Sequence, residues 1–331
     1  MLIDSFGRKI DYLRISLTQQ CNFRCVYCMP DTPEDFFDVK ALELSKLLEF
    51  VKIALDNGIK KIRLTGGEPL LRPDIAEFIA GIYAHNKNTE IALTSNAFLL
   101  EKFAQKLKDA GLKRINISLD SLKNERIRVI SKKDALPQIL RGIESAQKAG
   151  LKVKLNMVAL RYTQDEILDM LEFARMRGIM LRYIEFMENI HAKDDIRSLS
   201  SEEILSIIST RYTLKPLQKE NFGPAKIWEI DESESESKSA GRKPYVFGII
   251  APHEDDFCES CNRIRLTSEG VLCPCLFYQD SVDVSEAIIK GDKARMEELL
   301  KLAVKNKPEK NQWGAESGAQ ISSRAFYYTG G

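Results

Sequence analysis

The feature of this 331-residue chain that most restricts its fold is a regular alternation of short β-branched runs with longer amphipathic stretches, from residue 12 to about residue 210. A strand followed by a helix, repeated six times, predicts a parallel sheet with helices on its outer side. The expected strands are 12–18, 60–67, 89–96, 114–120, 152–160 and 180–187. Helical patterns occupy 43–58, 73–85, 98–111 and 164–178, several of them ending in Gly as helix C-termini prefer.

We expect these units to form an incomplete parallel (β/α)6 barrel of the TIM type, in the α/β class; a flat doubly wound sheet is the alternative. Polar residues near the strand ends favour the barrel, because such barrels build their sites on the C-terminal rim of the strands. All of these residues can line one pocket. The alternative is that they are ordinary loop residues, because every strand must pass into a polar loop. They are Thr65–Glu68, Thr94–Asn96, Ser118, Asp120, Asn156, Glu185 and Met187.

The pattern changes after residue 210, so we divide the chain into a barrel core, 1–210, and a smaller C-terminal region, 211–331. This region holds short strand candidates at 228–230 and 245–250. Between them, 231–243 is too rich in Ser and Glu to pack, and we expect a mobile surface loop there. The chain ends in Gly330-Gly331.

The charge of the chain is nearly balanced, with 49 Lys and Arg against 48 Asp and Glu. No net field exists to gather nucleic acid or an anionic membrane, so an anionic ligand needs local charge. No apolar run has membrane-spanning length, and the first residues lack a signal-peptide pattern. We therefore expect a cytoplasmic protein.

The seven cysteines fall into two tight groups, which in a reducing cytosol indicate metal or cluster sites rather than disulfides. The first group, Cys21, Cys25 and Cys28, follows the first expected strand. Three thiolates bind three corners of a cubane and leave its fourth iron open to another ligand. Zinc or buried free thiols are the alternative, but structural zinc requires four ligands and no nearby His completes the set.

The second group consists of Cys258, Cys261, Cys273 and Cys275. Four cysteines can form a zinc ribbon, although the C-x-C end matches the usual C-x2-C of a ribbon poorly. Cys258, Cys261 and Cys275 alone give a second set of three ligands with one open iron.

The first cysteine group, followed by Gly66-Gly67-Glu68-Pro69 after the second strand, resembles the radical S-adenosylmethionine superfamily. With Cys-Asn-Arg-Ile-Arg-Leu-Thr at 261–267, the chain further resembles the molybdenum cofactor biosynthesis protein A family, the GTP 3′,8-cyclases. This resemblance runs from 13–16 through 182–187 to the terminal glycines.

The resemblance implies a lyase with two [4Fe–4S] clusters and S-adenosylmethionine. The first cluster cleaves S-adenosylmethionine, and the resulting 5′-deoxyadenosyl radical removes the 3′ hydrogen of GTP. The C3′ radical then attacks C8 of the guanine, which the second cluster binds through its open iron. The product is (8S)-3′,8-cyclo-7,8-dihydroguanosine 5′-triphosphate, formed in an early step of molybdenum cofactor biosynthesis.

The resemblance also implies the roles of individual residues. The cluster ligands are Cys21, Cys25, Cys28, Cys258, Cys261 and Cys275. The contacts to S-adenosylmethionine are Tyr27, Gly67, Ser118 and Met187. The contacts to GTP are Arg14, Arg63, Thr94, Lys154, Arg263, Ile264 and Arg265. Arg14, Arg263, Arg265, Gly330 and Gly331 act in catalysis, the glycines through a tail that enters the active site.

The residue types suit these roles, because GTP carries about four negative charges and needs a local cationic cradle. Each of these residues also has a simpler structural explanation: a solvated Arg or Lys, a core Met, a packed Tyr or a frayed tail. Cys273 has no place in the family pattern, and 189–195 replaces an expected glycine-containing turn.

The expected partners are an electron donor such as flavodoxin or ferredoxin and the next enzyme of the pterin pathway, and a homodimer is one expectation for the assembly. Two rival functions remain open. The first is another radical enzyme with an auxiliary cluster, for instance one that modifies peptides. The second is a zinc-binding interaction module, for which a charge near zero argues against nucleic acid as the partner.

Overall fold

The computed structural model of this protein describes residues 1–29, 40–189, 196–217, 224–231, 244–252, 254, 257–311 and 324–330. Nearly all of the 189–195 turn, the 231–243 loop beyond its first residue, and Gly331 lie outside the described residues. None of the described helices is long and apolar enough to cross a membrane.

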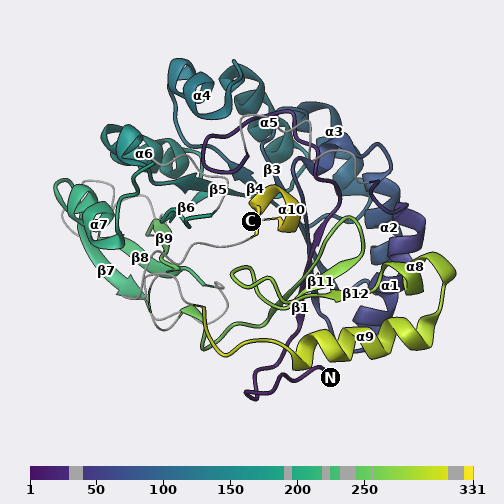
Figure 1. Ribbon diagram of the computed structural model, residues 1–331. Helices are drawn as coiled ribbons and strands as arrows, with labels where there is room; N and C mark the ends of the chain where they lie inside the picture. The colour runs from purple at the N-terminus through teal and green to yellow at the C-terminus, as the bar shows by residue number, and fades with distance from the viewer. Residues whose placement is uncertain are drawn as a thin grey trace.

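Six parallel strands form the centre of the fold, as the sequence predicted (Figure 1). Each pairs with the next along the chain, so the six follow one another across the sheet. They are β1 (Tyr12–Ser16), β2 (Lys61–Thr65), β3 (Glu90–Ser95), β4 (Arg114–Ser118), β5 (Lys152–Val158) and β6 (Met180–Ile184).

The strands of the C-terminal part extend this sheet at both edges. Beyond β1, β10 pairs in parallel and is followed by antiparallel β11 and β12; beyond β6, β9 pairs in parallel and is followed by antiparallel β8 and β7. The end strands β12 and β7 do not pair with each other, so the 12-stranded sheet is an open barrel. These strands are β7 (Thr213–Leu217), β8 (Lys226–Asp231), β9 (Val246–Ile250), β10 (Arg263–Leu266), β11 (Val271–Cys273) and β12 (Val282–Asp283).

Helices cover the outer face of the sheet (Figure 1). The four helices predicted from the sequence are α1 (Leu44–Asp56), α2 (Ile75–His85), α3 (Leu100–Asp109) and α6 (Ile167–Met176). Helices that the sequence patterns did not single out are α4 (Asn124–Ser131), α5 (Leu136–Lys148), α7 (Ser201–Ser209), α8 (Ser285–Lys290), α9 (Lys293–Lys305) and α10 (Phe326–Thr329). Two short 3-10 turns complete the described elements, η2 (Pro69–Leu71) and η3 (Arg161–Glu166).

The two faces of the central strands differ in chemistry, because neighbouring residues of a strand point to opposite faces. Leu13 and Ile15 of β1 are fully buried in the apolar core beneath the helices. Arg14 lies between them in sequence and pairs in register with Arg63 of β2 and Arg265 of β10. The core therefore lies between sheet and helices, and the concave side of the sheet carries charge. Helix α10 lies within this concave side (Figure 1).

Candidate active site

The first cysteine group lies on the loop after β1, where Cys21, Cys25 and Cys28 border a cavity at the C-terminal ends of the strands. Two backbone hydrogen bonds, of 2.8 and 3.0 Å, tie this loop to the end of α4. Burial, with repulsion from Cys28 and Cys21, raises the pKa of the Cys25 thiol well above its usual value. Three thiolates at this site therefore need a cationic centre to keep them ionised.

The spacing of the cysteines bears on which centre that is. Among the described residues, no three His, Cys, Asp or Glu side chains converge as the ligands of a single metal ion do. Tetrahedral zinc, with Zn–S bonds of about 2.3 Å, holds its sulfurs about 3.8 Å apart. A cubane binds each thiolate through a different iron, which allows wider spacing. Each group places three thiols at one cavity, the number that a cubane with one open iron takes from a protein.

The turn after β2 approaches the cysteine loop too closely to carry side chains. A Cβ on Gly66 would lie 2.5 Å from the carbonyl oxygen of Thr18, and one on Gly67 would lie 2.3 Å from that of Gln20. Gly66 also has a φ of +142°, which other residues rarely adopt. Glycine at both positions therefore lets this turn pack against the loop after β1, and both glycines line the cavity that the cysteines border.

Glu68 fixes this turn from within. Its side chain is fully buried, and Oε1 accepts hydrogen bonds from the Ser95 hydroxyl at 2.9 Å and the Leu70 N–H at 3.0 Å. Oε2 accepts from the N–H of Asn96 at 2.8 Å. Burial raises the pKa of Glu68 to about 7. The carboxyl group thus connects the turn after β2 to the end of β3.

All of the strand-end residues singled out in the sequence except Glu68 line this cavity, which we call the cysteine-loop cavity. Tyr27 donates to Oδ2 of Asp120 at 2.6 Å, and Oδ1 of Asp120 accepts from the N–H of Val158 at 2.9 Å. The phenol is therefore held in one orientation at the cavity wall. Other lining residues are Thr65, Gly66, Gly67, Thr94, Ser95, Asn96, Ser118, Asn156, Glu185, Met187 and Phe326.

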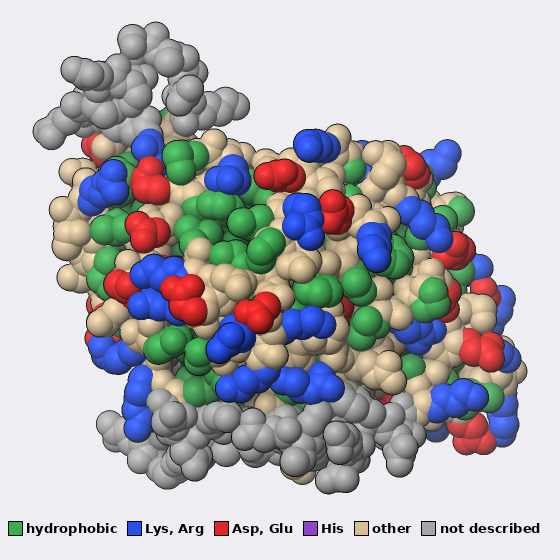
Figure 2. Space-filling view, turned by 90° about the horizontal axis from the view of Figure 1, so that it is seen from above, with side chains coloured by type: hydrophobic (Ala, Val, Ile, Leu, Met, Phe, Trp, Pro, Cys, Tyr) green, Lys and Arg blue, Asp and Glu red, His purple; other side chains and the backbone are tan. Residues whose placement is uncertain are grey.

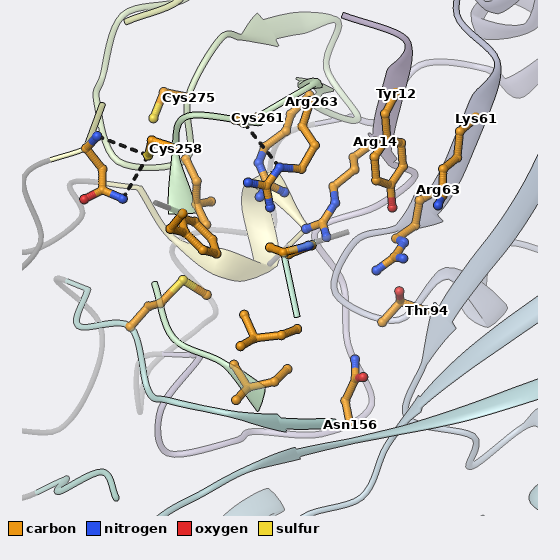
Figure 3. Close-up of a pocket in the computed structure, with 18 of the residues that line it drawn as sticks. Tyr12, Arg14, Lys61, Arg63, Thr94, Asn156, Cys258, Cys261, Arg263 and Cys275 are labelled. Atoms are coloured by element: carbon orange, nitrogen blue, oxygen red, sulfur yellow. Dashed lines mark hydrogen bonds between the residues drawn. The ribbon is translucent and has the colours of Figure 1, made fainter. Parts of the chain in front are cut away.

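A second cavity adjoins the first, and the two share Thr94, Asn156, Ile184 and Met187. We call it the arginine cavity, and in Figure 3 side chains from β1, β2 and β10 point into it. No Asp or Glu is among its described lining residues. Its cationic lining residues are Arg14, Lys61, Arg63, Arg114, Lys154, Arg182, Arg263, Arg265 and Lys307.

Several buried polar atoms of this cavity make no hydrogen bond within the described structure. Such atoms are rare in folded proteins and indicate a missing partner. Most of them are donors, so the missing partner must offer several acceptors. They include the Nε atoms of Arg63, Arg114 and Arg182, Oγ1 of Thr94 and Oδ1 of Asn156.

Crowding of like charges also favours an anion in the arginine cavity. Burial and the positive charge of Arg182 lower the pKa of Lys154 to about 7. Burial lowers the pKa of Arg63 to about 9, and Arg14 contributes in the same direction. A polyanion would relieve this repulsion. By contrast, cationic and anionic side chains are intermixed on the face shown in Figure 2.

Three cysteines of the second group, Cys258, Cys261 and Cys275, line the arginine cavity. The N–H and Nδ2 of Asn311 donate to the sulfur of Cys258 at 3.4 and 3.3 Å (Figure 3). Although burial alone would raise it, the pKa of the Cys261 thiol is lowered to about 6 by Arg263 and Lys307. The Cys261 sulfur is therefore prepared to act as a thiolate ligand, whereas burial raises the pKa of the Cys258 thiol.

The fourth cysteine of this group lies elsewhere. Cys273 is fully buried and lines neither cavity. Its sulfur accepts a hydrogen bond from Nη1 of Arg324 at 3.1 Å. None of the seven cysteines forms a disulfide.

The C-terminal segment reaches the same space. The carbonyl oxygen of Gly330 accepts a hydrogen bond from Nη1 of Arg265 at 2.6 Å. Gly330 has a φ of +69°, and a Cβ there would lie 2.0 Å from Cγ2 of Thr65. Only glycine fits this position without displacing its neighbours.

All but two of the described residues implied as site residues line one or both cavities. Ile264 is the first exception, because its side chain packs in the core on the other face of β10. Gly330 is the second, and it contacts Arg265 instead. Sequence reasoning missed Tyr12, Lys61, Arg114, Arg182 and Lys307. Strand alternation would have found Tyr12 and Lys61, which lie two residues before Arg14 and Arg63.

Two family comparisons cover most of the chain. Residues 15–174 match the radical SAM superfamily, and residues 179–313 match the family described as Molybdenum Cofactor Synthesis C.

Solved structures show the same fold. Streptococcus suis SuiB bound to S-adenosylmethionine aligns with a TM-score of 0.64 at 16% identity, over 84% of this chain and 64% of that one. Native anSMEcpe with bound AdoMet aligns with a TM-score of 0.61 at 18% identity, over 96% of this chain and 93% of that one. At such identities the likeness concerns the fold alone.

Curated relatives match the chain from end to end. A GTP 3′,8-cyclase of Helicobacter pylori strain J99 is 54% identical over 333 residues, covering 100% of both chains. One from Aliarcobacter butzleri strain RM4018 is 48% identical over 334 residues, again covering 100% of both. With the radical SAM match and the two joined cavities, these relatives show that the chain belongs to the GTP 3′,8-cyclase family of the radical SAM superfamily.

Proposed function

We propose that this protein converts GTP into (8S)-3′,8-cyclo-7,8-dihydroguanosine 5′-triphosphate, an early step of molybdenum cofactor biosynthesis. The observation that supports this most directly is the junction of the two cavities. Three cysteines border the cysteine-loop cavity, whereas cationic side chains and three further cysteines line the arginine cavity. Thr94 and Met187 line both cavities. A radical generated in the cysteine-loop cavity would need to travel only a short way to a nucleotide in the arginine cavity.

Membership of the radical SAM superfamily implies a [4Fe–4S] cluster and S-adenosylmethionine. Cys21, Cys25 and Cys28 would hold the cluster and leave one iron to the amino and carboxylate groups of S-adenosylmethionine. When bound, the two together supply the 5′-deoxyadenosyl radical that removes the 3′ hydrogen of GTP.

The residues around this site would orient the cofactor. Tyr27, fixed by its hydrogen bond to Asp120, presents an aromatic face to the adenosine part. Gly67 would border the methionine part, because it lines this cavity and, having no Cβ, packs directly against the cysteine loop. Ser118 and Met187 line the same cavity and complete the set. Because these groups are already in place, little order must be gained on binding.

The arginine cavity would hold GTP. Arg14, Arg63 and Lys154 offer donors to the triphosphate, and Thr94 adds a hydroxyl whose oxygen has no protein partner among the described residues. Charge-assisted hydrogen bonds to phosphate are stronger in a cavity that excludes water. We add Lys61 and Arg182 to this set, because they line the same cavity.

The second cluster would lie at the guanine end. Cys258, Cys261 and Cys275 would ligate it and leave one iron for the guanine. Asn311 and Arg263 donate hydrogen bonds to two of these sulfurs, which stabilises the thiolate form that a ligand needs.

The decisive experiment uses GTP deuterated at C3′, incubated without oxygen with S-adenosylmethionine and dithionite. Mass spectrometry should find the deuterium in 5′-deoxyadenosine and a cyclised product with the mass of unlabelled GTP, because an electron from the reductant and a proton replace the deuterium atom that is lost. The anaerobically purified protein should contain about eight iron and eight sulfide per chain. Cys25→Ala, which removes one ligand of the first cluster, should abolish 5′-deoxyadenosine formation. Transfer of no deuterium by the wild-type protein would contradict the proposal.

Three further expectations accompany this function. The reaction needs an electron donor, for which a flavodoxin or a ferredoxin is our proposal. The product must pass to the next enzyme of the pterin pathway. A cytosolic location suits seven cysteines that form no disulfide and clusters that are sensitive to oxygen.

A further inference from the structure

Arg324 makes an unusual set of contacts just before the C-terminal helix. Its side chain is 7% exposed, and each of its three guanidinium nitrogens donates to a different acceptor. Nη1 donates to the sulfur of Cys273 at 3.1 Å, and Nη2 donates to the carbonyl oxygen of Asp280 at 2.6 Å. Nε donates to the carbonyl oxygen of Tyr278. A guanidinium can satisfy three acceptors in one plane, which a lysine cannot.

This anchor lies beside the active-site arginine that receives the tail. Cys273 of β11 pairs in register with Arg265 of β10. Arg265 in turn donates to the carbonyl oxygen of Gly330, six residues after Arg324. The tail is therefore held at both ends, and both attachments lead to one pair of adjacent strands.

Between these two attachments, α10 contacts both cysteine groups. The backbone N–H of Tyr327 donates to the sulfur of Cys28, in the first group. Phe326 packs in an apolar cluster with Cys28 and with Cys275 of the second group. The four-residue helix α10 is too short to be stable alone, so its place between the groups depends on its attachments.

We propose that Arg324 is a positioning residue for cyclisation: by binding Cys273 and two carbonyl groups it holds the tail so that Tyr327 meets Cys28 and Gly330 meets Arg265. Cys273 is accordingly an acceptor for this anchor and not a cluster ligand. The inference rests on the proposed function where it concerns cyclisation. Its statement about the placement of the tail is independent of that function.

The test compares Arg324→Met with Arg295→Met, a matched change at an exposed arginine of α9. Amide hydrogen exchange of residues 326–330 in the cluster-loaded protein is measured first. Electron paramagnetic resonance of the reduced first cluster and the ratio of 5′-deoxyadenosine to cyclised product follow. Iron content and melting temperature serve as checks on the global fold.

For Arg324→Met we expect tail exchange to rise about tenfold or more, because hydrogen bonds of a charged donor are lost. The first-cluster spectrum should shift, and the ratio of 5′-deoxyadenosine to product should rise about tenfold, since a displaced tail disturbs geometry. Arg295→Met should match the wild type in all three measurements. If the amides of residues 326–330 exchanged at the wild-type rate in Arg324→Met, Arg324 would not anchor the tail. If the ratio of 5′-deoxyadenosine to cyclised product were unchanged, Arg324 would have no role in cyclisation.

Two further variants keep the test decisive if Arg324→Met does not fold. Arg324→Lys keeps the charge but not the three-way donation, so it should also loosen the tail. Cys273→Val removes an acceptor, whereas Cys273→Ser retains one, so tail exchange should rise more in the valine variant. Equal exchange in the two would overturn the role of Cys273. If wild-type protein forms no cyclised product, the proposed function fails, while the exchange measurement still decides on the anchor.

Discussion

Arg263 donates from Nε to the sulfur of Cys261 at 3.3 Å, and its guanidinium lies 4.9 Å from the centre of the Phe257 ring. The side chain is thus fixed between a sulfur and an aromatic face before any substrate binds. A donor held in this way loses little freedom on binding an anion. Arg263 therefore connects the second cysteine group to the cavity proposed for GTP.

The first prediction concerns this arginine. Arg263→Lys should weaken GTP binding about 10- to 100-fold, because a charge-assisted hydrogen bond contributes about 1.5–3 kcal/mol. Anaerobic calorimetry measures the dissociation constant, and about eight iron per chain should remain. Arg161→Lys, at an exposed ion pair that lines neither cavity, is the matched control. An unchanged dissociation constant in Arg263→Lys would show that this residue does not bind the nucleotide.

The second prediction separates the two cysteines of the C-x-C pair. Cys275 lines the arginine cavity, whereas Cys273 is fully buried against Arg324. Cys275→Ala should therefore lose about four irons per chain, and Cys273→Ala should keep all of them. Iron analysis and Mössbauer spectroscopy decide between them. The opposite result would reverse the ligand assignment.

The central fold was predictable because its signals are local. Each strand of the barrel carries its own β-branched run, and each crossover repeats the same pattern. The C-terminal strands were harder to place. The pairing of β10 with β1 joins segments at opposite ends of the chain, and nothing in either segment specifies its partner.

Prediction of the site had a similar limit. The motifs found both cysteine groups and the Gly66-Gly67 turn, whose requirement for glycine is visible in the close approach to Thr18. Lys61 and Arg182 carry no motif and were missed. They become part of the cavity because alternate residues face inward and neighbouring strands bring them together.

The third prediction is that GTP binds less tightly as pH rises above 7. Burial and Arg182 lower the pKa of Lys154 to about 7 in the free protein, so its ammonium form is already present below that pH. Bound triphosphate favours the ammonium form and raises the pKa. Above pH 7 binding must therefore take up a proton, and affinity should fall by up to about tenfold per pH unit until the pKa of the bound state is reached.

Two variants test the source of this pH dependence. Lys154→Arg remains charged over the whole range and should give a flatter profile between about pH 7 and 9. Tyr12 needs a separate control: burial alone would raise its pKa, but Arg63, Arg14 and Lys61 lower it to about 7. Tyr12→Phe should keep the slope if Lys154 is responsible. A flat profile in the wild type would exclude both groups.

The last prediction concerns the penultimate glycine. In Gly330→Ala the new Cβ would lie 2.0 Å from Cγ2 of Thr65, so the tail must move and its hydrogen bond to Arg265 must weaken or break. Gly291→Ala provides the matched control, because Gly291 has nearly the same φ, +70°, but has no atom within 4 Å of the added carbon. Both variants incur backbone strain of about 1 kcal/mol, and only Gly330→Ala adds the clash.

Mass spectrometry of the cyclised product tests this difference. The amount of product should fall by about tenfold or more in Gly330→Ala, because a shifted tail disturbs the geometry of the reacting groups, and it should be unchanged in Gly291→Ala. Thr65→Ser in the Gly330→Ala background removes Cγ2 and should restore part of the product. If Gly330→Ala cyclised GTP as well as Gly291→Ala does, the contact of the tail with Arg265 would have no part in the reaction.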